Sequence, residues 1–227
     1  MINTTKLRKV IGWLGMLLPW IVAALYFVYV IIAHDFENIL NRDSIHPFLI
    51  WLCDSISMTY HIPTCITPFM IILGAASLLL ITYEGYDKQD NIVCSIAGIC
   101  GLCICLFPCS NIYINIPDNI GAFLIPKQIS GILHNVAAVI FFLLLSYNSF
   151  FLFTKSSGEM TDEKRKRNII FRVCGIGMIV SLIAILPGFI FQWYGWTWLI
   201  EMIVLSFFGI SWLTKSQCYS WLFKDRD

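Results

Sequence analysis

Six long apolar segments dominate this sequence. They cover, in approximate numbering, residues 10–33, 64–83, 92–107, 130–153, 169–193 and 196–214. An apolar run of about 17–25 residues is long enough to cross the hydrocarbon core of a bilayer as a helix. Of all residues 58% are hydrophobic and only 13% are charged, whereas a typical soluble domain has about 25% charged residues. The sequence therefore predicts an all-α membrane protein, with one domain over residues 1–227 that forms a bundle of six transmembrane helices.

The basic residues predict how this bundle sits in the membrane, because Lys and Arg are enriched in short cytoplasmic loops. Twelve of them lie in the amino terminus, the 84–91 turn, the 154–168 loop and the tail, and the opposite side has only Arg42 and Lys127. We therefore expect both termini to be cytoplasmic, in a multi-pass protein of the cell membrane. A net charge of +1 gives no sign of nucleic-acid binding. Membrane lipids are the expected partners, and the sequence indicates no protein partner.

Ionisable residues inside apolar segments are the main functional signal. His134 and Glu201 lie about four and five residues inside their segments, which at 1.5 Å per residue places both roughly 6–8 Å below the same membrane surface. Such residues usually face the bundle interior or a watery cavity. The polar stretch Asp54–Thr64, which is rich in hydroxyl groups, reaches that same surface. We therefore predict an outer-facing polar pocket that binds a lipid or another amphiphile. Its predicted lining is Ser55, Ser57, Tyr60, His134 and Glu201.

A proline in the fifth segment bears on this pocket. Pro187 is followed by Gly188 at a depth similar to that of Glu201, and a proline inside a helix bends it. The bend is expected to open space beside Glu201. The structural alternative is that His134 and Glu201 only hydrogen-bond neighbouring helices, while Asp54 and the serines form a helix cap or a turn.

Two more specific functions are alternatives to amphiphile binding. In a metal-dependent intramembrane lipid hydrolase, His61, His134 and a carboxylate from Asp54 or Glu201 would hold zinc and activate water. Only four histidines occur, and none are spaced four residues apart, so no cofactor is expected. In a proton-coupled carrier Glu201 would titrate, but the sequence has no internal repeat of the kind many transporters show.

Cys53, Cys65 and Cys109 lie near the outer surface, where an oxidising compartment would allow pairing.

Short motifs add a resemblance to a known family. They are Ser55-Ile56-Ser57, Tyr83-Glu84-Gly85-Tyr86-Asp87, Leu133-His134 followed by small residues, and Glu201 with the 208–213 stretch. In these the chain resembles the prokaryotic six-helix membrane proteins grouped as domain of unknown function 998. It is more distantly similar to the damage-regulated autophagy modulator-like membrane proteins of eukaryotes. The resemblance implies a six-helix bundle and, for the prokaryotic relatives, the bacterial inner membrane. It implies no settled activity.

Overall fold

The computed structural model describes residues 4–32, 54–110, 116–156, 160–191 and 193–218. Nearly all regular structure in these ranges is helical. The exception is a hairpin of two strands, each of two residues, between the helices Lys88–Leu106 and Lys127–Tyr147. The elements are α1 (Thr4–Ile32), η2 (Ser57–His61), α3 (Pro63–Ile81), α4 (Lys88–Leu106), β1 (Asn119–Ile120), β2 (Ile125–Pro126), α5 (Lys127–Tyr147), its π-helical continuation η3 (Asn148–Leu152), α6 (Asp162–Phe191) and α7 (Trp196–Lys215).

Six of these helices are long and apolar enough to cross a membrane, which confirms the prediction of an all-α, multi-pass membrane protein. The helices continue beyond the predicted apolar segments into polar residues. For example, α1 begins at Thr4 and α6 at Asp162. A helix needs backbone hydrogen bonds rather than apolar side chains, and carboxylates in its first turn are favourable. At the start of α4, the Asp87 side chain accepts hydrogen bonds from the amides of Gln89 and Asp90, as an N-cap residue does.

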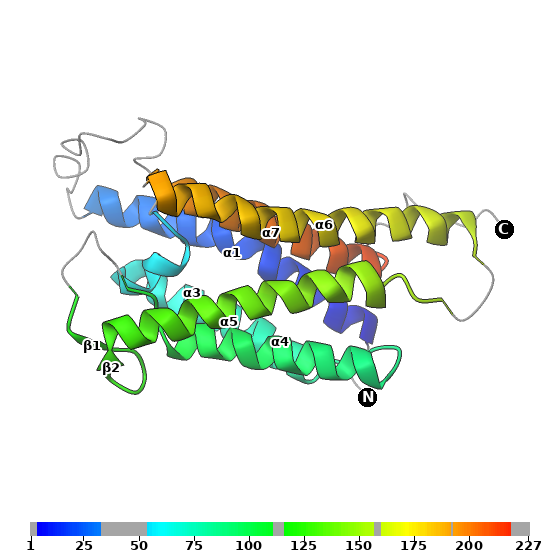
Figure 1. The fold of residues 1–227 in the computed structure, drawn as a ribbon, viewed down its shortest axis with the longest axis horizontal. Helices are drawn as coiled ribbons and strands as arrows, with labels where there is room; N and C mark the ends of the chain where they lie inside the picture. The colour runs from blue at the N-terminus through cyan, green and yellow to red at the C-terminus, as the bar shows by residue number, and fades with distance from the viewer. Residues whose placement is uncertain (1–3, 33–53, 111–115, 157–159, 192, 219–227) are drawn as a thin grey trace.

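The six long helices form a ring in which each packs against its neighbours in the order α1, α3, α4, α5, α6 and α7, and α7 closes the ring on α1. Figure 1 shows that α1 begins and α7 ends at one end of this bundle. We call this the Lys155 end. The opposite end, where α5 and α7 begin and the β1–β2 hairpin lies, is called the Glu201 end (Figure 1).

The core depends on close helix approach and on one aromatic layer. Gly98 of α4 lies so near α3 that a Cβ atom there would be 2.5 Å from the Ser77 carbonyl oxygen, as is usual for small residues between membrane helices. Near the Lys155 end, the Trp212 ring packs edge-on against Tyr83 and Phe153, with ring centroids 5.0 and 5.1 Å apart. Other large apolar side chains, such as Ile190 at 72% exposure, lie on the outside of the ring, where a bilayer would cover them.

Candidate functional site

Residues Asp54–Ile62, here called the crossing segment, precede α3 in the chain. They extend across the Glu201 end from the start of α7 to the residues that follow α4. Its first residue binds the start of α7: the Asp54 carboxylate accepts a hydrogen bond from the Gly195 amide at 2.9 Å, and its carbonyl accepts one from the Trp198 amide at 2.9 Å. Near its other end, the His61 Nε2 lies 2.8 Å from the Cys109 carbonyl oxygen. The segment is therefore held at both ends.

Glu201 holds the middle of this crossing segment. Its Oε2 accepts a hydrogen bond from the Ile56 amide at 2.5 Å, and its Oε1 accepts one from the Ser55 hydroxyl at 3.2 Å. The Ser57 amide in turn donates to Ser55 Oγ at 3.1 Å. Amides at the start of a helical turn have no partner within it, and here the Glu201 side chain supplies the acceptor at the start of η2. Three predicted site residues, Ser55, Ser57 and Glu201, are thus brought together.

Asp54 carries the second carboxylate beside this contact. Burial raises the pKa of the Asp54 carboxyl above its ordinary value, and the hydrogen bond from the Gly195 amide partly opposes that effect. Gly195 has a φ of 74°, a left-handed conformation that glycine adopts without steric cost. This tight turn brings the first turn of α7 back under the crossing segment and so makes the contacts of Asp54 possible.

The other two predicted site residues lie at the α4–α5 side of the same end. His134 is buried in α5, and its Nδ1 lies 2.8 Å from the Phe107 carbonyl oxygen. Because a carbonyl only accepts, that nitrogen carries the proton. The half-buried Tyr60 ring meets the His61 ring edge-on with centroids 5.5 Å apart, and burial, followed by the nearby Cys105 thiol, raises the pKa of Tyr60. In the described part of the chain, no hydrogen bond joins Tyr60 or His134 to Glu201.

The metal-binding alternative has no ligand set in the described ranges. No three His, Cys, Asp or Glu side chains there are close enough together to hold a metal ion. Asp54 binds the start of α7, whereas His61 and His134 donate to carbonyls that follow α4. Cys65 is a free thiol whose Sγ lies 3.7 Å from the Val22 carbonyl oxygen. Cys53 lies outside the described residues, so its pairing stays a prediction.

Trp196 lies beside the Pro187-Gly188 pair of α6. A Cβ atom on Gly188 would lie 2.5 Å from the Trp196 ring, whose Nε1 donates to the Ala184 carbonyl at 2.6 Å. The indole therefore fills the space beside this pair, and an opening next to Glu201 stays a prediction. Nothing in the local sequence pattern around Trp196 signals this contact.

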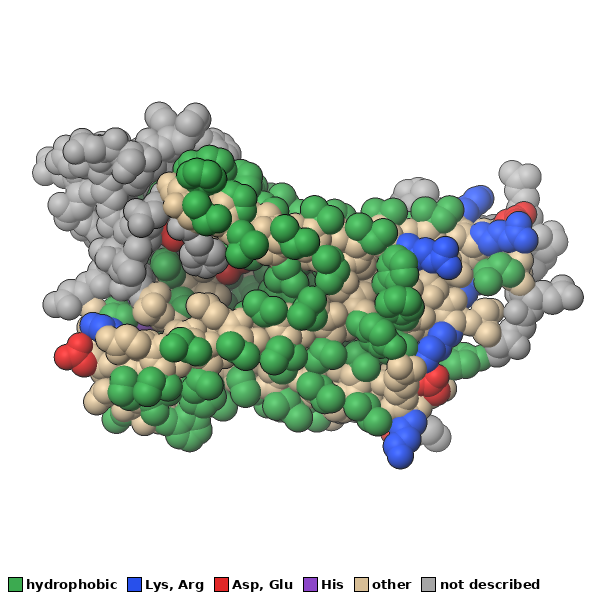
Figure 2. Space-filling view, in the orientation of Figure 1, with side chains coloured by type: hydrophobic (Ala, Val, Ile, Leu, Met, Phe, Trp, Pro, Cys, Tyr) green, Lys and Arg blue, Asp and Glu red, His purple; other side chains and the backbone are tan. Residues whose placement is uncertain are grey.

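A different opening lies between α5 and α6. The two helices are joined near the Lys155 end, where Ser146 Oγ donates to the Gly175 carbonyl at 2.7 Å and Ser149 Oγ donates to the Phe171 carbonyl at 2.8 Å. Toward the Glu201 end the two helices diverge (Figure 1). Figure 2 shows a hollow between them there, with acidic side chains visible in it. We call it the α5–α6 hollow.

Helical periodicity identifies the residues that face this α5–α6 hollow. On α5, Phe142, Ala138 and Asn135 lie four, eight and eleven residues before Ser146 and so share its face. On α6, Ile179 and Leu182 lie four and seven residues after Gly175 and share its face in the same way. The walls are therefore apolar, with one exposed amide at Asn135. Glu201 of α7, which is half-buried, lies at the same end of the bundle.

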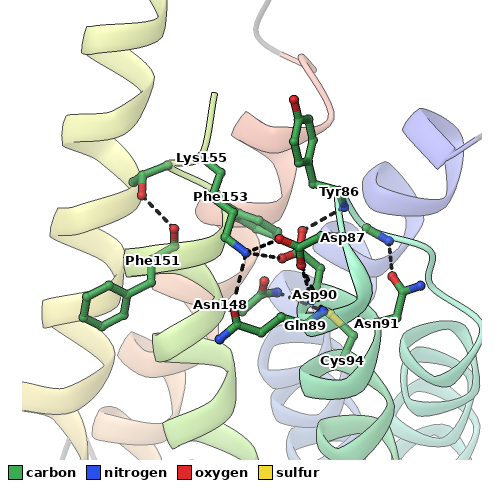
Figure 3. A network of polar contacts seen from close by, with 12 residues as sticks. Tyr86, Asp87, Gln89, Asp90, Asn91, Cys94, Asn148, Phe151, Phe153 and Lys155 are labelled. Carbon is green, nitrogen blue, oxygen red and sulfur yellow. Dashed lines mark hydrogen bonds and ion pairs between the residues drawn. The ribbon is translucent and has the colours of Figure 1, made fainter. Parts of the chain in front are cut away.

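A second polar cluster lies at the Lys155 end and was not among the predicted site residues (Figure 3). The Lys155 ammonium donates to Asp87 at 2.7 Å, to Asp90 at 3.2 Å and to the Gln89 amide oxygen at 3.3 Å. The hydrogen bond to Asp87 raises the pKa of Lys155, and the same bond lowers the pKa of Asp87. The Asp90 carboxylate is buried and also accepts from the Tyr86 amide at 2.8 Å. The sequence shows the acidic residues of this cluster, but it does not show that Lys155, more than sixty residues away, is their partner.

We expect Lys155→Gln to lower the free energy of unfolding by about 1–2 kcal/mol, because it removes the cation from the buried carboxylate of Asp90. Thermal or denaturant unfolding of the purified protein in detergent measures this loss. Lys127→Gln is the matched control, since its partner Asp118 is 96% exposed and an exposed pair contributes little, here less than about 0.5 kcal/mol. Equal losses in the two variants would contradict the structural role of Lys155.

Comparison of the chain with protein-family models, with curated proteins and with solved structures found no match. The resemblance to the domain of unknown function 998 family and to the autophagy modulator-like proteins therefore stays a prediction. Any function has to be argued from the residues of this chain.

Proposed function

We propose that this multi-pass membrane protein binds a lipid or another amphiphile in the α5–α6 hollow at the Glu201 end. The observation that carries the proposal is the hollow where α5 and α6 diverge at the end of the bundle that also holds Glu201 (Figure 2). A hollow with apolar walls and a few polar groups at one end suits a molecule that is itself apolar along most of its length. Its head would meet Glu201, Ser55 and the exposed amide of Asn135.

The fixed contacts of Glu201 favour a binding protein over the proton-coupled carrier. In a carrier, this carboxylate would give up its bonds to Ser55 and Ile56 in each cycle. As it stands, Glu201 anchors the crossing segment at the Glu201 end of the bundle. A binding site needs such a stable wall, and preorganised groups reduce the cost of holding a ligand.

The orientation forms part of this proposal. At the Lys155 end lie Arg8, Lys88, Lys155, Lys164 and Lys215, whereas among the described residues Lys127 is the basic residue of the Glu201 end. We infer that the Lys155 end is cytoplasmic, since basic residues concentrate on that side of membrane proteins. Both termini would then be cytoplasmic, and the α5–α6 hollow would open in the outer leaflet.

Ala138→Trp tests the proposal by filling the α5–α6 hollow with an indole ring. If the ring displaces about two methylene groups of the ligand, at about 0.8 kcal/mol each, retention falls roughly tenfold. Native mass spectrometry of the purified protein, followed by lipid extraction, measures how much co-purified amphiphile each variant retains.

The matched control for this experiment is Ile140→Trp. Ile140 is two residues further along α5, on a different face, and is 40% exposed, so the added ring would point toward acyl chains. The control is expected to retain the ligand as the unmodified protein does. Identical retention in both variants, or no retained amphiphile in the unmodified protein, would contradict the proposed function.

A further inference from the structure

Two lysines at the Lys155 end are held unusually close together. Lys164 Nζ of α6 and Lys215 Nζ of α7 both donate to the carbonyl oxygen of Phe153, at 3.0 and 3.1 Å. The two ammonium nitrogens are therefore no more than about 6 Å apart, a separation at which like charges repel. Each ammonium has three donors, and the shared carbonyl takes one from each.

Aromatic rings fix the position of these ammonium groups. Lys215 lies 5.1 Å from the centroid of the Phe153 ring, and both Lys164 and Lys215 lie 5.8 Å from that of Phe171. These are cation–π distances. Phe153 itself packs against buried Trp212, so the lysines rest on the rigid aromatic layer of the core. The pair is thus built into the fold rather than carried on a free loop.

Two carboxylates of the same end, those of Asp87 and Asp90, already have a cation as their partner. Asp87 and Asp90 bind Lys155 (Figure 3), and Arg8 donates its Nε to the Tyr83 hydroxyl at 3.0 Å. No ion pair found between residues of the described ranges includes Lys164 or Lys215. Lys215 is also within electrostatic range of Arg8, Arg167 and Asp90, which on balance adds positive charge around it.

Capping of the C-terminal end of the α5–η3 helix accounts for only one of the two lysines. Phe153 is the residue that ends η3, and a helix C-terminus carries about −0.5 elementary charge. One lysine would be enough to complement it, and here two are directed at the same carbonyl. An anion with several acceptor oxygens can meet both side-chain nitrogens at once. A phosphate group has this chemistry.

We propose that Lys164 and Lys215 bind a phosphate group at the Lys155 end, either the headgroup of an anionic phospholipid or a free phosphate. This site lies at the opposite end of the bundle from the α5–α6 hollow and does not depend on it. The two ammonium groups contact the phosphate oxygens, while Arg8 and Arg167 increase the local positive potential.

The experiment uses the full chain in nanodiscs of zwitterionic lipid that contain a small fraction of phosphatidylglycerol. Lys164→Gln combined with Lys215→Gln is expected to lower the retention of phosphatidylglycerol about tenfold, as measured by native mass spectrometry. Arg165→Gln combined with Lys166→Gln removes the same charge from two exposed positions of the same end and is expected to change retention less than about twofold.

A second experiment, on the unmodified protein, distinguishes the two sources of phosphate. In detergent, inorganic phosphate is added at constant ionic strength with chloride as the reference anion. A rise in the unfolding temperature of the unmodified protein identifies a site for free phosphate, whereas lipid retention without this rise identifies a headgroup site. Lys164→Arg combined with Lys215→Arg keeps both charges and should keep binding, which controls for misfolding of the Gln variants.

Two results would overturn the proposal. One is equal loss of phosphatidylglycerol from both double Gln variants, which would mean diffuse attraction to the basic surface. The other is a lower unfolding temperature in the Lys164 and Lys215 variants with unchanged lipid retention and no effect of phosphate, which would mean helix capping alone.

Discussion

Gly98→Ala is expected to destabilise the bundle by about 2–3 kcal/mol, although alanine is the better helix former by about 1 kcal/mol. The added methyl group would lie 2.5 Å from the Ser77 carbonyl oxygen and 3.0 Å from the Ile81 amide nitrogen. Both are backbone atoms, so no side-chain rotation relieves the clash, and α3 has to move away from α4. Thermal unfolding in detergent, with reversibility checked, measures the change.

Gly74→Ala is the matched control, because it makes the same substitution on the neighbouring helix α3. A Cβ atom at Gly74 would meet nothing within 4 Å, so only the helix-propensity gain remains. We expect it to raise stability by up to about 1 kcal/mol. The two variants should therefore change stability in opposite directions. Effects of the same sign and size would show that the α3–α4 contact is not as tight as described.

Glu201→Leu is expected to release the crossing segment from α7. The substitution leaves the Ile56 amide and the Ser55 hydroxyl without their acceptor, and loss of a charge-assisted hydrogen bond costs about 2 kcal/mol. Local opening of the segment should then become about 30-fold more frequent. Hydrogen–deuterium exchange, followed at the amides of Ile56 and Ser57, measures this change directly.

Two further measurements make this test specific. Glu201→Gln keeps one carbonyl oxygen as an acceptor at the same place, so exchange at Ile56 should increase less than in Glu201→Leu. The α3–α4 core, for example at Ala97, is buried and remote from the crossing segment, so its exchange should not change in either variant. Unchanged exchange at Ile56 in Glu201→Leu would remove the anchoring role assigned to the carboxylate.

The two ends of the bundle separate two kinds of polar contact. At the Glu201 end, carboxylates bind backbone amides of the crossing segment and of the Gly195 turn. At the Lys155 end, side-chain charges bind one another and the Phe153 carbonyl. A bound amphiphile is proposed at the first end and a phosphate at the second. Each proposal has its own variants and its own readout, so the failure of one leaves the other standing.

Some site residues were predictable because their signal is local. His134, Glu201 and the hydroxyls near Ser55 stand out as polar groups in or beside apolar segments, where burial without a partner is costly. The sequence therefore identified residues that do make contacts at one end of the bundle. It did not identify Lys164 and Lys215 as a pair, because a basic stretch at a helix end looks the same whether its side chains point outward or converge on one carbonyl.

The sequence alone determined the six helices and their approximate limits, because a bilayer offers no partner for backbone amides and carbonyls and so leaves apolar segments of this length only the helix. The tertiary structure alone decided the partners: Glu201 meets Ile56, 145 residues away in the chain, and Trp196 fills the space beside Pro187. The physical reason is that apolar helix faces resemble one another in sequence. Which faces meet, and where α5 and α6 diverge, depends on the fit of small and large side chains across the whole ring.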